Sequence, residues 1–218
     1  MKISVIVTCY NLEKYISRAI YSCLDQTISE ENYEIIVVDD YSTDNSWNVI
    51  QSVGDLGGRI VSVRHSENKG VGEASNTALS VAKGKYVVKV DGDDFINKNF
   101  LFAMSQILDY NEEIGFVYGD HLIVDENNKR QYSINTLDKL LDNGAGVMFR
   151  TKNVNSLGGY ATKYKTRDDY DLITRYIKNF DGYYLKLPYY RYFQRNGSLS
   201  KNAAQRELEK NEIDKNNN

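Results

Sequence analysis

The chain has 218 residues, a formal net charge of −3 and a hydrophobic content of 41%. This length equals about one and a half typical domains, which excludes a large multidomain assembly within the chain, and the apolar content is sufficient for a sizeable core. The slightly acidic balance provides no overall positive field, so we expect no nucleic-acid partner. Two cysteines, Cys9 and Cys23, are too few for a disulfide framework or a four-ligand zinc site.

The apolar segments of the chain are all short. The first, Ile3 to Val7, is too short for the apolar region of a signal peptide. No segment approaches the roughly 20 apolar residues of a membrane-spanning helix. We therefore expect a cytoplasmic protein without a transmembrane segment, for which peripheral contact with a membrane is left open.

The first 120 residues alternate short β-branched runs with segments of helical periodicity. Apolar residues recur at helical spacing in Leu12 to Gln26 and again in Phe100 to Leu108. Several of the runs are apolar throughout, as in strands that are buried on both faces. This order predicts an α/β fold with a parallel sheet and covering helices. The expected strands are Ile3 to Val7, Glu34 to Val38, Arg59 to Val63, Lys85 to Val90 and Gly115 to Tyr118.

After residue 120 the pattern changes to that of a smaller subdomain laid against the sheet edge. A helix is expected from Asp168 to Phe180. The expected strands are His121 to Val124 and Arg130 to Tyr132, which form a hairpin, and then Gly146 to Phe149, Tyr183 to Leu187 and Tyr189 to Phe193. The segment from Lys201 onward is rich in Lys, Glu and Asn, so we expect a solvated helix that frays into disorder.

Polar residues follow three of the expected strands. They are Thr8 to Asn11, Asp39 to Asp44 and Asp91 to Asp94. Ligands of open parallel sheets bind beyond the carboxyl ends of the strands, so these segments are the candidate site. None of them carries the glycine pattern of a dinucleotide site or of a phosphate-binding loop. The ligand is therefore expected to be held by carboxylates and aromatic rings.

The segment Asp91-Gly92-Asp93-Asp94 places three carboxylates within four residues. Their mutual repulsion favours a bound cation. Mg²⁺ or Mn²⁺ often takes one or two carboxylates and completes its shell with water and phosphate oxygens, a chemistry that suits a nucleotide diphosphate. The alternative is an acidic turn with local hydrogen bonds.

Asp39 and Asp40 lie at the end of the second expected strand. A carboxylate at this place can accept the ring N–H of a uracil base, and Tyr10 could stack on that ring. The alternative for Tyr10 is simple packing, since the chain has 18 tyrosines. The alternative for Ser42 to Asp44 is the N-cap of a helix through Trp47 and Ile50.

The order and spacing of these motifs resemble those of the family 2 glycosyltransferases of the GT-A fold. The resemblance covers nearly the whole chain before the last 18 residues. It rests on Ser4 to Asn11, Glu34 to Asp44, Asn68 to Gly70 with Asn76, Lys83 to Asp94, Gly144 to Arg150, Gly158 to Tyr160, Asp168 to Leu172 and Arg191 to Ser200.

The resemblance implies a Rossmann-like GT-A sheet with helices on both faces and a smaller C-terminal acceptor subdomain. Residues 1–118 would form the donor-binding half, 119–200 the half that holds the acceptor and the catalytic base, and 201–218 a solvated tail. The implied reaction is inverting, metal-assisted transfer of a sugar from a nucleotide diphosphate sugar, a UDP-sugar by preference, with Mn²⁺ or Mg²⁺. The implied acceptor is a saccharide or lipid-linked saccharide in surface polysaccharide or glycolipid synthesis.

The resemblance also implies a role for individual residues. Thr8, Tyr10 and Asp40 would hold the base, with Asp39 beside them, and Asn68 and Asn76 belong to the same donor site. Asp91 would lie near the ribose and the metal, Asp93 would bind the metal and the diphosphate, and Asp94 would support it. Asp169 matches the catalytic base, in a motif usually written Glu-Asp and here Asp168-Asp169.

The chain departs from the family pattern at three positions. Tyr41 stands where a glycine or another small residue is usual, and Ser75 stands in place of an arginine. Arg195 lies where many members carry a histidine that helps to close the donor site. If the side chain of Arg195 points into the site, it would neutralise the charge of the diphosphate. The alternative is that Arg195 is a solvent-exposed arginine in a loop.

The proposed chemistry follows from charge. The acceptor hydroxyl must lose its proton as it attacks the anomeric carbon, and Asp169 would accept that proton. Asp168 would raise its proton affinity, and a metal held by Asp93 would stabilise the leaving group. The alternative is that Asp168 and Asp169 only favour the N-terminus of a helix.

Two other kinds of protein stay possible on these residues. A phospho-acceptor receiver domain also places an acidic pair after one strand and an aspartate after a later strand, around Mg²⁺. A sugar-nucleotide-binding protein without catalysis is the second, favoured by Ser75 and Arg195. Substitution of Asp169 distinguishes them, because it should abolish transfer and spare donor binding only in an enzyme.

Overall fold

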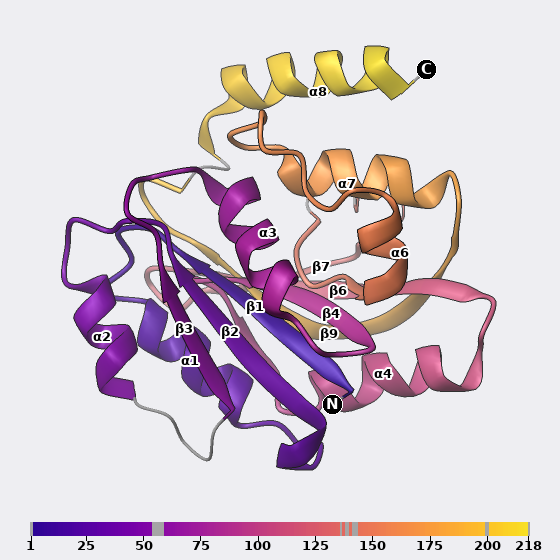
Figure 1. The fold of residues 1–218 in the computed structure, drawn as a ribbon, viewed down its shortest axis with the longest axis horizontal. Coiled ribbons are helices and arrows are strands. Elements are labelled where there is room, and N and C mark those ends of the chain that lie inside the picture. The colour runs from indigo at the N-terminus through magenta and orange to yellow at the C-terminus, as the bar shows by residue number, and fades with distance from the viewer. Residues whose placement is uncertain are drawn as a thin grey trace.

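A single curled sheet forms the centre of the molecule (Figure 1). The structure, a computed structural model, describes residues 2–53, 59–135, 137, 140, 144–198 and 201–217. Over these residues the strand order is β3-β2-β1-β4-β8-β6-β9-β5, and β7 pairs with β6. Strands of the first and second halves of the chain therefore belong to one sheet, and β4 and β8 join the two halves.

The strands of the first half are parallel and bring their carboxyl ends to one edge. They are β1 (Ile3–Cys9), β2 (Tyr33–Asp39), β3 (Ile60–Arg64) and β4 (Tyr86–Asp91). Every residue of β1 and β2 is buried, which accounts for their continuous apolar runs. In the register, Cys9 lies beside Asp39 and Thr8 beside Asp91. The polar segments that follow these strands are thereby brought together.

The strands of the second half run mostly antiparallel to their neighbours. β6 (Ile114–Asp125), β7 (Arg130–Ser133) and β8 (Met148–Arg150) lie near the predicted positions, and the short β5 (Phe95–Ile96) was not predicted. The two strands predicted on either side of Pro188 are one strand, β9 (Asp181–Gln194). Pro188 lies where the pairing with β6 shifts register, between Leu185 and Tyr190. A proline is tolerated in a strand at such an irregularity.

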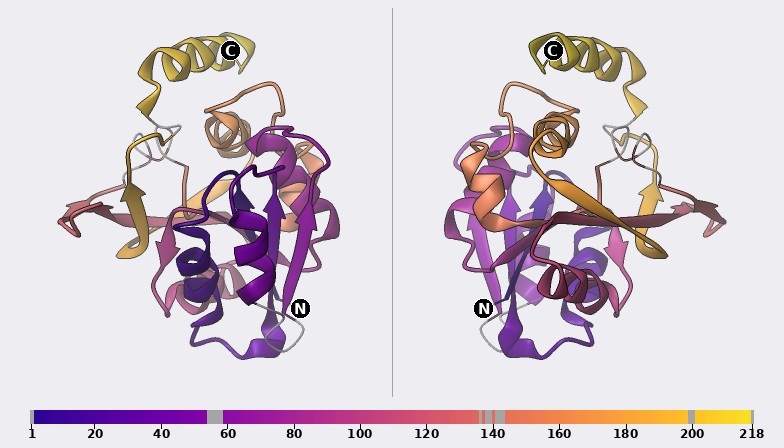
Figure 2. Two further views of the ribbon diagram at one scale, coloured as in Figure 1. Left: turned by 90° about the vertical axis from the view of Figure 1, so that its left-hand side faces the viewer. Right: turned by 90° about the vertical axis from the view of Figure 1, so that its right-hand side faces the viewer.

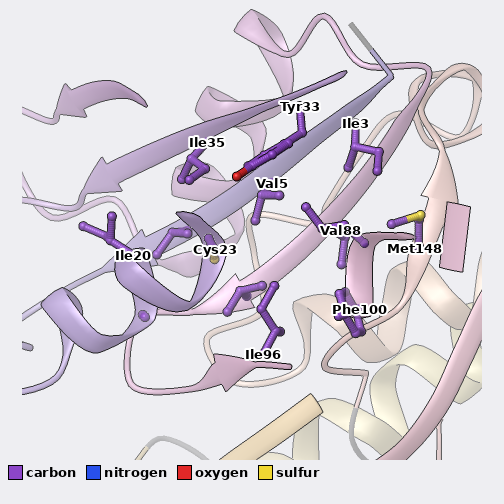
Figure 3. Close-up of a cluster of buried hydrophobic side chains, with 14 of the residues drawn as sticks. Ile3, Val5, Ile20, Cys23, Tyr33, Ile35, Val88, Ile96, Phe100 and Met148 are labelled. Carbon is purple, nitrogen blue, oxygen red and sulfur yellow. The ribbon is translucent and has the colours of Figure 1, made fainter. Parts of the chain in front are cut away.

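Helices cover both faces of the sheet, as predicted (Figures 1 and 2). On one face α1 (Ile16–Leu24), α2 (Ser46–Val53) and α4 (Phe100–Tyr110) pack on side chains such as Val5 and Val88 (Figure 3). On the other face α3 (Val71–Val81), α6 (Thr151–Ser156) and α7 (Asp168–Ile177) bury a second cluster. A 3₁₀ turn, Glu30–Asn32, leads into β2. None of the helices of the described residues is long and apolar enough to cross a membrane.

The C-terminal segment is a mostly exposed helix, as predicted, but two of its side chains are buried against the rest of the molecule. It forms α8 (Ala203–Asn217), a 15-residue helix that lies above α7 (Figure 1). Most of its side chains are exposed, but Ile213 is fully buried in a small cluster with Tyr164 and Tyr170. Glu209 is also buried and accepts hydrogen bonds from the loop before α7. One apolar residue and one anchored carboxylate therefore hold a helix of otherwise polar composition.

Candidate active site

The strand ends open into a cavity of about 830 Å³. Residues from both halves of the chain and from α8 line it. All of the predicted site residues except Asp39 and Asn76 are among them: Thr8, Tyr10, Asp40, Asn68, Asp91, Asp93, Asp94, Asp169 and Arg195. The structure thus gathers most of the predicted donor, metal and base residues around one space.

Asp40 organises the part of the cavity next to β1 and β2. Its carboxylate accepts hydrogen bonds from Lys69 N at 2.9 Å and Gly70 N at 2.8 Å, and it lies 2.7 Å from His65 Nδ1. Asn68 donates to the backbone oxygen of Asp40. Asp40 therefore fixes the loop before α3. The buried His65, which the sequence analysis did not select, contacts the carboxylate of Asp40.

Asp39 is fully buried and does not line the cavity. Arg64 Nε lies 3.0 Å from Asp39 Oδ2, so the two side chains form an ion pair. The angle at this contact is too poor for a hydrogen bond, and both carboxylate oxygens lack hydrogen-bond partners among the described residues. Asp39 thus stands beside the base site, with acceptor capacity that the described residues do not use.

Tyr10 lines the cavity with a ring that is 46% exposed. The ring is available to a ligand, which distinguishes Tyr10 from the tyrosines of the core. Asp44 Oδ1 accepts a hydrogen bond from Ser46 N at the start of α2, as the N-cap alternative predicts. Ser42 has a different structural contact, because its Oγ accepts a hydrogen bond from Asn11 N after β1.

The three carboxylates of the Asp91–Asp94 segment point to different partners. Asp94 is 1% exposed and accepts hydrogen bonds from Tyr190 Oη and Phe193 N, both at 2.7 Å. Asp93 pairs with Arg195, whose Nε donates to Asp93 Oδ2 at 2.6 Å. A Cβ at Gly92 would lie 2.6 Å from the Thr8 carbonyl oxygen, so this turn requires glycine.

Burial raises the pKa of both Asp93 and Asp94 above the ordinary range, and the neighbouring carboxylates add to this. Arg195 opposes the increase at Asp93. The Arg195 side chain is 17% exposed, so the inward orientation, and not the solvated alternative, is the one observed. Asp94 holds β9 against the turn, whereas Asp93 pairs with Arg195 in the cavity lining.

Asp169 lies at the start of α7, and its side chain is 24% exposed. Both of its carboxylate oxygens accept hydrogen bonds from Lys89 Nζ at 3.1 Å. Burial raises the pKa of Asp169, Lys89 lowers it, and Asp168 and Asp91 raise it again, to a net value of about 7. A carboxylate with this pKa is suited to accept a proton near neutral pH.

Lys89 is a site residue that the sequence analysis missed. Its side chain is 8% exposed, and its Nζ also contacts Asp168 Oδ2 at 3.2 Å and Asp91 Oδ1 at 3.4 Å. Burial lowers the pKa of Lys89, but the three carboxylates outweigh it and hold that pKa well above the ordinary value. The signal in the sequence was a lysine inside the otherwise apolar strand β4.

Asn76, which was predicted to belong to the donor site, binds the backbone of Tyr160. Its Nδ2 donates to Tyr160 O at 2.8 Å, and its Oδ1 accepts from Tyr160 N at 2.9 Å. Asn76 does not line the cavity. It joins α3 to the segment after α6, which is a structural role.

The three carboxylates next to the cavity do not by themselves form a complete metal site. Over the described residues, no group of three or more His, Cys, Asp or Glu side chains could hold a metal ion. Asp93 and Asp91 nevertheless fit the chemistry of Mg²⁺ or Mn²⁺, which takes one or two carboxylates and fills its shell with phosphate oxygens and water. Burial is the main cause of the raised pKa of Asp93, and the neighbouring charge of Asp91 adds to it.

Comparison with known proteins identifies the family. Residues 4–174 match the family described as Glycosyl transferase family 2. The chain belongs to this glycosyltransferase family. The phospho-acceptor receiver, the first alternative above, is therefore set aside.

Several family 2 relatives resemble this chain over part of their length. An uncharacterized glycosyltransferase of Nostoc is 36% identical over 155 residues, which are 70% of this chain and 47% of the relative. The poly(ribitol-phosphate) beta-N-acetylglucosaminyltransferase TarS of Staphylococcus aureus is 38% identical over 109 residues, 50% of this chain and 19% of the relative. A third relative is the UDP-Glc:alpha-D-GlcNAc-diphosphoundecaprenol beta-1,3-glucosyltransferase WfaP of Escherichia coli. It is 39% identical over 93 residues, which are 43% of this chain and 36% of the relative. The chain thus spans less than half the length of these relatives.

Solved structures confirm the GT-A fold of this chain. S. aureus TarS 1–349 in complex with UDP-GlcNAc has a TM-score of 0.80 and 25% identity, covering 93% of this chain and 61% of that one. A mannosyltransferase from Pyrobaculum calidifontis, in complex with GDP-Man and Mn²⁺, has a TM-score of 0.70 at 21% identity and covers 90% and 58%. The second likeness concerns the fold alone.

Two of the departures from the family pattern have a visible structural form. Tyr41 has a φ of 63°, in the left-handed region that glycine adopts easily, and its side chain is 46% exposed. Ser75 is buried, and its Oγ donates to Val71 O within α3. Ser75 therefore supplies no charge to the cavity.

Proposed function

We propose that this chain is an inverting glycosyltransferase that moves a sugar from a nucleotide diphosphate sugar to a hydroxyl of a saccharide or lipid-linked saccharide, in surface polysaccharide or glycolipid synthesis. The observation that carries the proposal is the position of Asp169. This partly exposed carboxylate, with a pKa of about 7, lines the same cavity as the Asp93–Arg195 pair. A base and a charged site for the leaving group are both required for a single displacement.

The donor would occupy the side of the cavity formed by the strand ends. Tyr10 offers an exposed ring for stacking, and Thr8, Asp40 and Asn68 lie around it in the cavity lining. Asp39 lies behind this part of the lining, fully buried and paired with Arg64. The likeness to TarS, which binds UDP-GlcNAc, supports a uridine donor.

Asp93, with Asp91 beside it, would hold Mn²⁺ or Mg²⁺ together with the diphosphate. A bound divalent cation would act as a Lewis acid toward the leaving diphosphate. The guanidinium of Arg195 donates a hydrogen bond to the carboxylate of Asp93. A guanidinium can also pair with phosphate oxygens in a bidentate manner. Asp94, whose oxygens are engaged by Tyr190 and Phe193, would keep the turn in place.

Asp169 would accept the proton of the acceptor hydroxyl as the oxygen attacks the anomeric carbon. Lys89 contacts both oxygens of Asp169 and one of Asp168, so it keeps the carboxylate of Asp169 in one orientation. The attack displaces the nucleotide diphosphate directly, so the configuration at the anomeric carbon inverts.

The test is a thermal-shift screen of UDP, GDP, dTDP and CDP, each with and without Mn²⁺. We expect one nucleotide to raise the melting temperature of the wild type in a metal-dependent manner, and Asp93→Ala to lose the increase. Asp181→Ala changes an exposed aspartate on β9 that does not line the cavity and serves as the matched control. A screen in which no nucleotide adds to the effect of Mn²⁺ would sink the proposal.

The inactive sugar-nucleotide-binding protein stays an alternative. It is separated from the enzyme by an assay of transfer with the nucleotide sugar of the selected base. Location in the cytoplasm and peripheral contact with a membrane stay predictions from the sequence, as does the division at residue 118.

A further inference from the structure

Arg18 of α1 contacts the turn that follows β4 without lining the cavity. Its Nη2 donates a hydrogen bond to the backbone oxygen of Asp93 at 2.7 Å. Its guanidinium carbon lies 4.4 Å from the centre of the Phe95 ring and 4.1 Å from the centre of the Phe193 ring. One side chain of the first helix therefore touches the Asp91–Asp94 turn, β5 and the end of β9.

The charge of Arg18 is kept at a cost. Its Nε is buried and has no hydrogen-bond partner among the described residues, and a buried donor without a partner is unfavourable. An apolar side chain of similar length would fill the space beside the two rings without this cost. Such a side chain could not donate to Asp93 O or attract the carboxylates of Asp93 and Asp94. The hydrogen bond and the charge of Arg18 therefore act on the turn.

Phe193 connects Arg18 to Arg195. The backbone N–H of Phe193 donates to Asp94 Oδ1 at 2.7 Å, and its ring packs on Tyr15 with the ring centres 5.4 Å apart. Arg195 follows two residues later, and its guanidinium carbon lies 5.5 Å from the centre of the same Tyr15 ring. Tyr15 and Arg18, at the start of α1, thus support the strand end that carries Arg195.

Asp93 and Arg195 are the two charged groups that the proposed function places at the diphosphate. Arg195 Nε donates to Asp93 Oδ2 at 2.6 Å, and both residues line the cavity. Arg18 contacts the backbone of Asp93 directly and the strand end of Arg195 through Phe193. A small shift of either segment would change the distance between the carboxylate and the guanidinium, and recognition of a phosphate by charged groups depends on their geometry.

We propose that Arg18 is a positioning residue for the diphosphate of the donor. This inference rests on the proposed function and assigns to α1 a part in the diphosphate site. Arg18 holds Asp93 and the strand end of Arg195 in the arrangement that receives the diphosphate and its metal. Tyr10 and Asp40, at the expected base site, have no hydrogen bond, ion pair or ring contact with Arg18 within the described part of the chain. The loss of Arg18 should therefore affect the diphosphate and spare the nucleoside.

The experiment compares UDP with UMP by calorimetry on the full chain, with Mn²⁺ present throughout. The ratio of the two dissociation constants isolates the contribution of the second phosphate. Arg18→Met keeps a long side chain beside the rings and removes the hydrogen bond and the charge, whereas Arg18→Lys keeps the charge and a donor. Lys14→Met removes an exposed cation four residues earlier and controls for charge. Ile20→Val, at a fully buried position of α1 (Figure 3), controls for lost stability.

We expect the wild type to bind UDP more tightly than UMP by about tenfold or more. Arg18→Met should weaken UDP by roughly tenfold, the equivalent of one charge-assisted hydrogen bond, and UMP by less than about twofold. Arg18→Lys should weaken UDP by only about threefold, because it retains a charged donor for Asp93 but loses the planar group. Lys14→Met and Ile20→Val should leave both affinities as in the wild type.

The wild type separates the failure of this inference from that of the proposed function. If it binds no nucleotide of the thermal-shift screen, the proposed function fails first; if it selects another base, the mono- and diphosphate of that base replace UMP and UDP. If the wild type prefers UDP but Arg18→Met weakens UDP and UMP equally, or weakens neither, the inference is overturned. If Arg18→Met does not fold, Arg18→Lys decides by the same criterion: a loss confined to UDP supports the inference, and an equal or absent loss overturns it.

Discussion

The cavity joins two regions that are built in different ways. The donor floor, formed by the ends of β1, β2 and β4, is acidic and is fixed by the register of a parallel sheet. The basic wall, which consists of the lining residues Lys163, Lys165, Arg167 and Arg206, comes from the loop before α7 and from α8, and its geometry depends on how α8 is anchored. The floor is therefore determined by local sequence and sheet pairing, whereas the wall is determined by a contact between segments 40 or more residues apart. Variants in each region should have separable effects on donor and acceptor.

The largest effect is expected from Asp169→Asn, which should separate chemistry from donor binding. An amide cannot accept the acceptor proton, so we expect the rate of transfer to fall by roughly 10²- to 10⁴-fold. The nucleotide affinity should change by less than about twofold, since the donor is expected on the floor. Steady-state transfer and calorimetry measure the two quantities, with Asp181→Asn as the control. A variant that transfers at the wild-type rate would rule out Asp169 as the base.

Lys89→Met should affect both stability and the pH dependence of the reaction. Removal of the buried cation leaves Asp91, Asp168 and Asp169 uncompensated, and we expect the free energy of unfolding to fall by about 3 kcal/mol in urea titrations. In the wild type, activity should be lost as pH falls through about 7, where Asp169 becomes protonated.

Lys89 lowers the pKa of Asp169, so its removal should shift the midpoint of that loss to higher pH. Lys89→Arg keeps the charge and should retain a midpoint close to that of the wild type. An unchanged midpoint in Lys89→Met, at equal folded fraction, would mean that Lys89 does not act on the base.

Glu209→Ala should disturb the basic wall and spare the donor floor. The carboxylate accepts hydrogen bonds from Lys165 N, Thr166 N, Thr166 Oγ1 and Gln205 Nε2, at 2.7 to 2.9 Å. Burial raises the pKa of Glu209, but these hydrogen bonds outweigh it and lower that pKa overall. The loss of the carboxylate should cost about 2 kcal/mol of stability, since two buried backbone N–H groups lose their acceptor.

Hydrogen exchange of α8 and of residues 163–167 provides the measurement for Glu209→Ala. Both should exchange faster, while the melting-temperature increase with UDP stays as in the wild type. Glu207→Ala, an exposed change on the same helix, is the control and should leave exchange unaltered. A reduced response to UDP in Glu209→Ala would show that the two regions are coupled.

The sequence predicted the floor much better than the wall. The sequence showed apolar runs that alternate with helical segments, with polar residues after each run. These patterns were enough to predict that Thr8, Asp40 and Asp91 lie at one edge, because parallel strands place their carboxyl ends at the same edge of the sheet. Lys89 was missed because its meaning depends on α7, a helix some 80 residues later in the chain.

Two further features depend on contacts between segments that are distant in the chain. Asn76 belongs to a motif of the family, and its amide binds the backbone of Tyr160, a contact that no local pattern encodes. The C-terminal segment has the composition of a solvated tail, and only the burial of Ile213 and Glu209 shows that it packs. Composition describes the average polarity of a segment, whereas the packing of α8 against the rest of the molecule depends on single residues.

The smallest effect is expected from Tyr41→Gly, at the edge of the donor floor. A side chain in the left-handed region costs roughly 1–2 kcal/mol of folding free energy, and glycine removes this cost. Glycine also increases the entropy of the unfolded chain, which offsets about 0.5–1 kcal/mol of the stabilisation. Tyr41 is about half exposed and does not line the cavity, so few contacts are lost. We therefore expect a stabilisation of less than about 1 kcal/mol in urea titrations, with unchanged UDP affinity.

The matched control is Asn128→Gly in the turn between β6 and β7, which has a φ of 60°. Asparagine tolerates this conformation better than tyrosine, so the gain there should be smaller. Weaker UDP binding by Tyr41→Gly would instead place the Tyr41 ring against the base. In that case the donor floor extends beyond the cavity lining, and the departure from glycine at this position contributes to donor choice.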